Sequence, residues 1–249
     1  MNKDLAKKVE DFRNAVTKTG EDIVFNKFPT KLLELNQLVQ TTLTTDSPFH
    51  LSHAETCTDT TVYPPSLDAS ANGPVQKKRK RDNDAQEIDK TNDLQYAVFP
   101  GRILANQHMS KNVHNVVKGE CAELAAMIDQ VKLWVTLTMP KIEDGDNFGV
   151  QIQEEVLAEL HRAQESAYNL RDAARQDYLA RAKVCSKILK YPNIEDYTLA
   201  LKEHDEKQLY IARQHLVDIR NLYAVLTDLI HKNILKIRAP KANNSFGLY

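Results

Sequence analysis

Apolar residues recur every three or four positions in two parts of the chain, and this spacing predicts amphipathic α-helices. In residues 1–43, the apolar stripe comprises Leu5, Val9, Phe12, Val16, Leu32, Leu35 and Val39. Pro29 interrupts this stripe. Because proline lacks the N–H that an interior helical hydrogen bond needs, we expect a kink or a restart of the helix there.

Residues 106–240 predict three further long helices. Their apolar stripes run from Val113 to Val135, from Val156 to Ile188 and from Ala212 to Ile237. Pro140, Pro192 and Pro240 separate or end them. No run with strand periodicity competes, so we predict an all-α fold, an up-and-down bundle of four long helices. Apolar and alanine-rich positions beyond one core seam predict that such rods pack side by side against copies of themselves.

Between these parts, residues 44–105 show no periodicity and many Pro, Thr, Ser and Asp residues, which predicts a flexible linker. The linker contains five consecutive bases, namely Lys77, Lys78, Arg79, Lys80 and Arg81. An exposed basic run of this kind favours a nuclear localisation signal read by an import receptor. A solvated run of mixed charge is the alternative. Nucleic-acid binding is disfavoured because no aromatic residues interleave with the bases.

The overall charge of the chain does not predict electrostatic attraction to a partner. The formal net charge is −1, so neither nucleic acid nor an anionic membrane is expected as a partner. No apolar run approaches the roughly 18 residues of a membrane span, and the charged stretch at the start does not resemble a signal peptide. These features predict the cytoplasm or the nucleus, and the basic run Lys77–Arg81 favours the nucleus, with some protein in the cytoplasm. Cys57, Cys121 and Cys185 lack paired spacing and are expected to be reduced thiols.

The chain lacks the motifs that commonly mark a nucleotide-binding or hydrolytic site. Glycine-rich phosphate loops and the common hydrolase motifs are missing, so we predict neither an enzyme nor a bound cofactor. The tightest group of metal-binding residue types is HLSHAETC, with His50, His53 and Cys57. It lies in the predicted linker without a second ligand pair, so we expect a solvated loop and no metal site.

The stretch PKIEDGDNFG, residues 140–149, partly matches a calcium-binding loop. Asp144, Asp146, Gly149 and Glu155 occupy its first, third, sixth and twelfth positions. Phe148 stands at the fifth position, where a side-chain oxygen is needed. A plain connection between helices is therefore favoured over calcium binding.

Several longer blocks carry a resemblance to a known family. They are PKIEDGDNFGV followed by QEE, then KYPNIEDY, IRNLYAVL and HKNILKIRAP. In this order, across roughly residues 95–249, they resemble the REG or eleven-S family of ATP-independent proteasome activators. The linker with KKRKR is similar to the gamma-type, nuclear homoheptameric member.

The resemblance implies a four-helix bundle that assembles into a seven-membered ring. Members of the family are not enzymes. They dock on the α-subunit end ring of the 20S proteasome and open its gate, which stimulates ATP-independent and ubiquitin-independent hydrolysis of peptides and some proteins. A helical scaffold or adaptor and a calcium-responsive helical protein are the alternatives.

Two segments would carry this function by resemblance. The activation loop, residues 140–150, contains Ile142, Glu143, Asp144, Gly145, Asp146, Asn147, Phe148 and Gly149. The proteasome-binding tail, residues 241–249, ends in Phe246, Gly247, Leu248 and Tyr249. Glycines and Asx residues can give the loop a stiff shape. Asp146 departs from the family, which usually has asparagine there.

Overall fold

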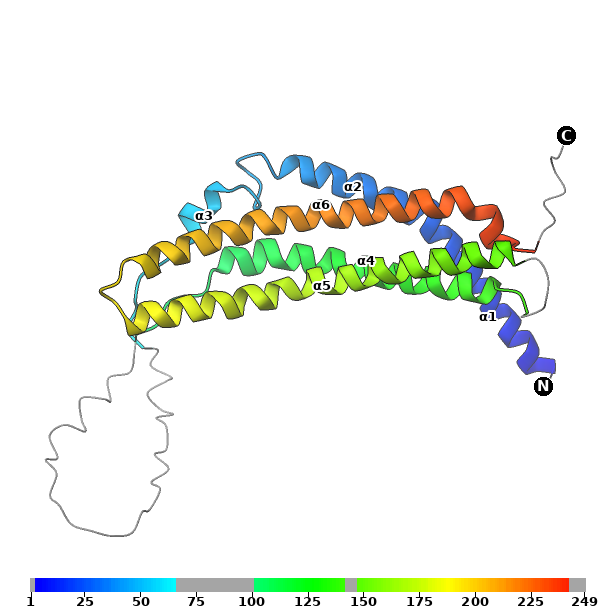
Figure 1. Ribbon diagram of the computed structural model, residues 1–249, viewed down its shortest axis with the longest axis horizontal. Helices are drawn as coiled ribbons and strands as arrows, with labels where there is room; N and C mark the ends of the chain where they lie inside the picture. Colours follow the sequence, from blue (N-terminus) through cyan, green and yellow to red (C-terminus); the bar gives the residue numbers. More distant parts are fainter. Residues whose placement is uncertain (1–2, 66–100, 142–146, 242–249) are drawn as a thin grey trace, which may run out of the picture.

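The computed structural model describes residues 3–65, 101–141 and 147–241, and it confirms the predicted all-α bundle of long helices. The helices form four rods that lie side by side (Figure 1). The rods are α1 (Lys3–Asp22), the π-helix η1 (Ile23–Lys27) and α2 (Phe28–Thr41); the π-helix η3 (Met109–His114) and α4 (Asn115–Thr138); α5 (Phe148–Lys190); and α6 (Asp196–Arg238). Helix α5 packs against α4 and α6, whereas α2 packs against α6 and α1 against α4.

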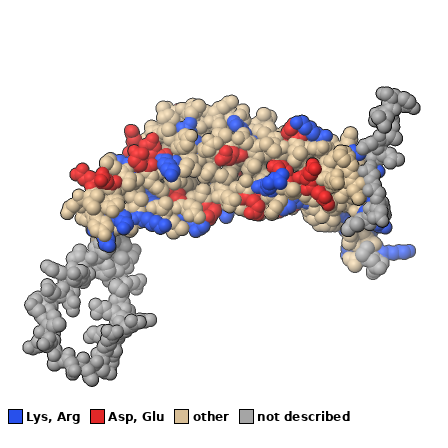
Figure 2. All heavy atoms as spheres, viewed as in Figure 1, with Lys and Arg blue, Asp and Glu red and all other residues tan. Residues whose placement is uncertain are grey.

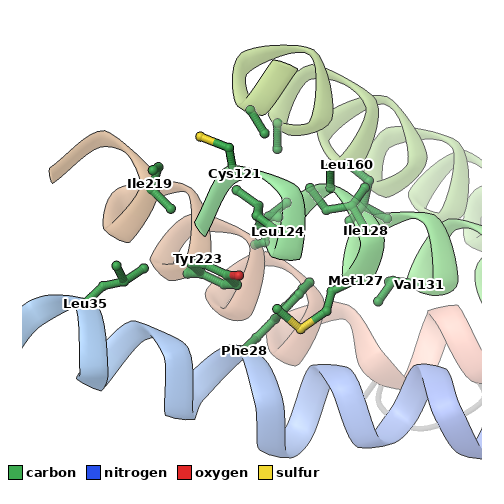
Figure 3. Packing of buried hydrophobic residues seen from close by; sticks show 14 of the residues in the cluster. Phe28, Leu35, Cys121, Leu124, Met127, Ile128, Val131, Leu160, Ile219 and Tyr223 are labelled. Atoms are coloured by element: carbon green, nitrogen blue, oxygen red, sulfur yellow. The ribbon is translucent and has the colours of Figure 1, made fainter. Parts of the chain in front are cut away.

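The core is built from the predicted apolar stripes where the rods meet. Phe28 of α2 packs edge-on against Tyr223 of α6, with ring centroids 5.6 Å apart. Leu124 and Ile128 of α4 and Leu160 of α5 complete this part of the core, and all three are fully buried (Figure 3). Burial also raises the pKa of the Tyr223 hydroxyl, since its ionised form would be poorly solvated.

The first rod changes direction before Pro29. The wide turns of η1 precede Pro29, which lies in the first turn of α2, where its missing N–H breaks no helical hydrogen bond. After this change of direction, α2 contacts α6, while α1 contacts α4 (Figure 1). Gly20 allows the close approach of α1, because a Cβ atom there would lie 2.6 Å from Cβ of the buried Trp134.

The predicted stripe of α1 faces the bundle only in part. Val16 is buried, but Leu5, Val9 and Phe12 remain 53%, 41% and 55% exposed. The reason is geometric, since the N-terminal part of α1 diverges from the other rods (Figure 1). These three apolar side chains therefore form a surface stripe within the chain, and we call it the α1 stripe.

The predicted linker, residues 44–105, contains more structure than its composition indicated. The short helix α3 (Ser52–Cys57) packs against α6, and Phe49 just before it is only 1% exposed. Tyr63 and Arg102 pair through two backbone hydrogen bonds of 2.8 Å. One aromatic anchor, Phe49, and a few turns create no periodic pattern, so this structure could not be predicted from periodicity. The basic run Lys77–Arg81 lies outside the described residues.

Two buried carboxylates join the helices near α3. Asp177 of α5 accepts hydrogen bonds from Nε2 of His114 and of His204, at 2.7 and 2.8 Å. Burial alone would raise the pKa of Asp177, but these hydrogen bonds outweigh burial and the pKa is lowered. Asp205 of α6 accepts a 3.0 Å hydrogen bond from Nε of Arg181. The ends of α5 and α6 are thus fixed by polar contacts as well as by apolar packing.

The described surface carries charges of both signs. On the face shown in Figure 2, Lys and Arg side chains are interspersed with Asp and Glu side chains, without a large field of one sign. Within the described part of the chain, no helix combines the length and the apolar character needed to cross a membrane.

Candidate functional site

The predicted activation loop lies between α4 and α5, and the structure describes only its two sides. Ile142, Glu143, Asp144, Gly145 and Asp146 lie outside the described residues. Asn147 directly precedes α5, and its carbonyl oxygen accepts a 2.9 Å hydrogen bond from the backbone N–H of Gln151. Phe148 and Gly149 are already helical, and Phe148 is 55% exposed. The second side of the loop is therefore the rigid first turn of α5, with an aromatic side chain at the surface.

This helix start excludes the calcium-loop alternative. A calcium loop needs a sharp, non-helical turn at its sixth position, and its ligands extend to the twelfth. Here the sixth position, Gly149, already lies within α5. The apparent match in residue types does not correspond to the backbone that such a loop requires.

Gly149 lies directly against Pro240, the second residue after α6. A Cβ atom at this position would lie 2.1 Å from the carbonyl oxygen of Pro240 and 2.6 Å from its Cα. Both are backbone atoms, so they could not move aside by a simple side-chain rotation. Glycine at 149 thus allows the start of α5 to touch the chain that leads from α6 into the predicted tail.

Gln153, one turn further along α5, joins three helices. Its Nε2 donates hydrogen bonds to the carbonyl oxygen of Ile237 in α6, at 2.8 Å, and to Oγ1 of Thr138 in α4, at 3.2 Å. The side chain is fully buried. The Ile237 carbonyl belongs to the last turn of its helix, where no further helical N–H is available to it. One amide therefore fixes the end of α4, the start of α5 and the end of α6 together.

Contacts with the first rod hold the end of α6 from another side. Nε of Arg238 donates a 2.8 Å hydrogen bond to Oε1 of Glu21, and the guanidinium lies 5.2 Å from the ring centroid of Phe25. His231 Nε2 donates to the carbonyl oxygen of Val24 at 2.9 Å. A carbonyl can only accept, so this nitrogen of His231 carries the hydrogen. The last turns of α6 are thus held by α1, η1 and α5.

These contacts place the bases of the two predicted functional segments at one end of the bundle (Figure 1). Helix α4 ends and α5 begins there, and α6 ends beside them. The tail residues Phe246, Gly247, Leu248 and Tyr249 lie outside the described residues. We call Gly149, Gln153, Ile237 and Pro240, which join the two bases, the loop–tail clamp.

Gln153 was not among the residues predicted for the site. Its sequence signal is its spacing: it stands three positions before Val156 and seven before Leu160, on the buried stripe of α5. A polar side chain on such a stripe needs buried hydrogen-bond partners. The partners could not be named from the sequence, because Thr138 and Ile237 come from other helices.

We expect Gln153→Ala to loosen the clamp. The substitution leaves the Ile237 carbonyl without its donor and should lower the free energy of unfolding by about 1–3 kcal/mol. Amide hydrogen exchange at residues 237–239 and 241 should accelerate in the variant. The matched control is Gln151→Ala, because Gln151 lies on the exposed side of the same turn. Equal exchange rates in the two variants would contradict the clamp.

Comparison with known proteins identifies relatives over nearly the whole chain. The family models "Proteasome activator PA28, N-terminal" and "Proteasome activator PA28, C-terminal" match residues 3–51 and 102–247. The human protein named proteasome activator complex subunit 3 is 37% identical, over 97% of this chain and 95% of its own length. Proteasome activator 28 of Dictyostelium discoideum is 29% identical, over 75% of this chain and 79% of its own length.

Solved structures show the same architecture. The 11S subunit of the Plasmodium falciparum proteasome, PA28, superposes with a TM-score of 0.71 at 29% identity, covering 97% of both chains. A chain from the crystal structure of an archaeal 20S proteasome with a mutated P26 activator gives a TM-score of 0.65. That chain is only 12% identical, over 98% of this chain and 99% of its own length, so it supports the fold alone.

Proposed function

Because the chain belongs to the PA28 family of proteasome activators, we propose that it activates the 20S proteasome as a regulator without enzymatic activity of its own. It docks on the α-subunit end ring through its tail, opens the gate with its activation loop and uses no ATP. The observation that carries this proposal is the loop–tail clamp. Two segments that must reach the same surface of one partner leave the bundle from a common base.

The tail and the activation loop have separate roles in this proposal. Binding of the tail residues Phe246–Tyr249 supplies affinity, while the loop around Asp144–Phe148 contacts the gate. A ligand shifts a conformational equilibrium only by binding one state better than the other. The loop must therefore make contacts with the open gate that the closed gate does not offer. Such contacts require a fixed loop position relative to the docked tail, and the contacts of Gln153 and Gly149 at the two bases support this requirement.

Self-association would raise the affinity of the tails. The α1 stripe, formed by Leu5, Val9 and Phe12, is apolar and exposed within one chain, and burial in a second copy would remove it from water. A head-to-tail interface that closes by rotation forms a ring, and the resemblance implies seven subunits. Linking several weak tails on one rigid body raises avidity by about 10²–10⁴-fold through effective concentration.

The test is hydrolysis of short fluorogenic peptides by latent 20S proteasome, without ATP. We expect the full chain to stimulate hydrolysis severalfold, and a chain lacking residues 246–249 to lose this stimulation because it cannot dock. Sedimentation of both chains is the control, since removal of the tail should leave the assembly state unchanged.

A different result would redirect the assignment. If the shortened chain stimulates as well as the full chain, the tail has no docking role. If neither chain stimulates although both sediment as rings, the result points to Asp146 in the activation loop; if both are also monomeric, the activator assignment is contradicted.

We also propose import into the nucleus through the basic run Lys77–Arg81. Five adjacent bases on a long connection suit an acidic receptor groove. Replacing all five with alanine should shift a fluorescent fusion of the full chain from the nucleus to the cytoplasm. Replacing Lys3, Lys7 and Lys8, bases near the start of α1, is the control and should leave the distribution unchanged. Nuclear accumulation of the five-alanine variant would refute the signal.

A further inference from the structure

Three side chains of metal-binding type meet beside α3. His53 and Cys57 are four residues apart on α3, which places them on the same face of the helix. His108 comes from the other side of the segment 66–100, immediately before η3. One ligand atom from each residue lies within 4.8 Å of the other two, and all three residues are half-buried. The group was missed in the sequence because its third member is far from HLSHAETC along the chain.

The ring of His108 is held by hydrogen bonds at both nitrogens. Its Nε2 lies 2.7 Å from the carbonyl oxygen of Pro48 and must donate to it, because a carbonyl has no hydrogen to offer. Nδ1 then carries the lone pair in the neutral ring and accepts a 3.2 Å hydrogen bond from the amide of Asn112. Donation of one ring N–H to a backbone carbonyl is the usual support for a histidine that binds a metal through its other nitrogen.

The other two candidate ligands, His53 and Cys57, lie next to His108. The ring of His53 stacks on that of His108, with centroids 4.4 Å apart and an angle of 26° between the planes. Cys57 is a free cysteine, so its sulfur is available as a thiolate ligand. The side chains of His53 and Cys57 both extend from α3, which packs against α6. Helix packing thus brings two nitrogen ligands and one sulfur ligand close together on a supported surface.

We propose that His53, Cys57 and His108 bind one Zn²⁺ ion. Imidazole nitrogen and thiolate sulfur are the ligands that zinc prefers, and three protein ligands leave a fourth, tetrahedral position for water. Bonds of about 2.0–2.3 Å place tetrahedral ligand atoms roughly 3.3–3.8 Å apart. The ligand atoms lie within 4.8 Å of one another, so binding requires them to move closer and the His53 ring to turn out of its stack so that its lone pair points at the ion. Zinc replaces the weaker contact of His108, the one to Asn112.

The ion would join the two sides of the segment 66–100 at their base. Polar contacts already converge there: Oδ2 of Asp205 accepts hydrogen bonds from Thr58, at 2.9 Å, and from Asn106, at 3.1 Å. Tyr63 and Arg102 flank the same segment on its two sides, and their backbones are paired with each other. A metal that binds only the folded arrangement adds its binding free energy to the stability of that arrangement. The site is therefore a structural clip for the base of the segment, and it does not depend on the proposed function.

Cobalt provides a direct probe, because Co²⁺ occupies zinc sites and reports its ligands by colour. The full chain, without an affinity tag, is stripped of metal under a non-chelating reductant and titrated with Co²⁺. We expect one ion per chain, with the visible bands of tetrahedral cobalt and the ultraviolet charge-transfer band of a cobalt–thiolate bond. Zn²⁺ should displace the cobalt and bleach both bands.

Two ligand variants and one matched control decide the assignment. Cys57→Ser should abolish the thiolate band. His53→Gln should weaken Zn²⁺ binding by at least about 10–100-fold, the loss that is typical when only an outer partner of a ligand is removed. Cys185→Ser removes another half-buried thiol and should retain both the band and the affinity. Circular dichroism of each variant verifies that the helices remain folded.

The thermal midpoint gives a second readout. Zn²⁺ should raise the unfolding temperature of the full chain and of Cys185→Ser, but not that of Cys57→Ser. The proposal is overturned if the full chain shows no thiolate band at one equivalent of cobalt. It is equally overturned if the folded Cys57→Ser variant retains that band.

Discussion

The close contact between Gly149 and Pro240 is the constraint on which the functional account depends. With no side chain at 149, the first turn of α5 touches the backbone that leaves α6, and a single added carbon would lie 2.1 Å from the Pro240 oxygen. Gln153 adds hydrogen bonds across the same junction. A loop base and a tail base that are joined in this way can act on a partner as one rigid unit.

Packing along the long rods determines where the helix ends at this junction lie. Buried stripes of α4, α5 and α6 set the axial position of each helix end, and Arg238 attaches the end of α6 to Glu21 of α1. The opposite end of the bundle is organised differently. There the buried carboxylates Asp177 and Asp205, together with α3, hold the chain on both sides of the segment 66–100. The bundle therefore separates the end that carries the bases of the predicted loop and tail from the end that carries the proposed metal site.

The sequence predicted the long helices well, because a period near 3.6 repeated over many turns leaves little choice of structure. It failed where order depends on single contacts. Phe49 anchors the chain before α3 without any periodic pattern, and His108 completes the group with His53 and Cys57 only after folding. Periodicity identified the α1 stripe as an apolar face, but it did not show which part of that face the bundle covers. Of the predicted activation loop, the structure describes only the two sides, and Phe148 and Gly149 on the second side are helical.

The most direct test of the account is to compare docking and gate opening in Gly149→Ala, with Gly119→Ala as control because a Cβ at 119 meets no atom within 4 Å. Binding to the 20S proteasome and stimulation of peptide hydrolysis are measured separately on the same samples. The account predicts that Gly149→Ala still binds through its tails but stimulates hydrolysis less. Stimulation should fall about tenfold for each 1.4 kcal/mol of open-gate stabilisation that is lost when the loop is displaced. Stimulation equal to that of Gly119→Ala, at equal binding, would show that the junction does not position the loop.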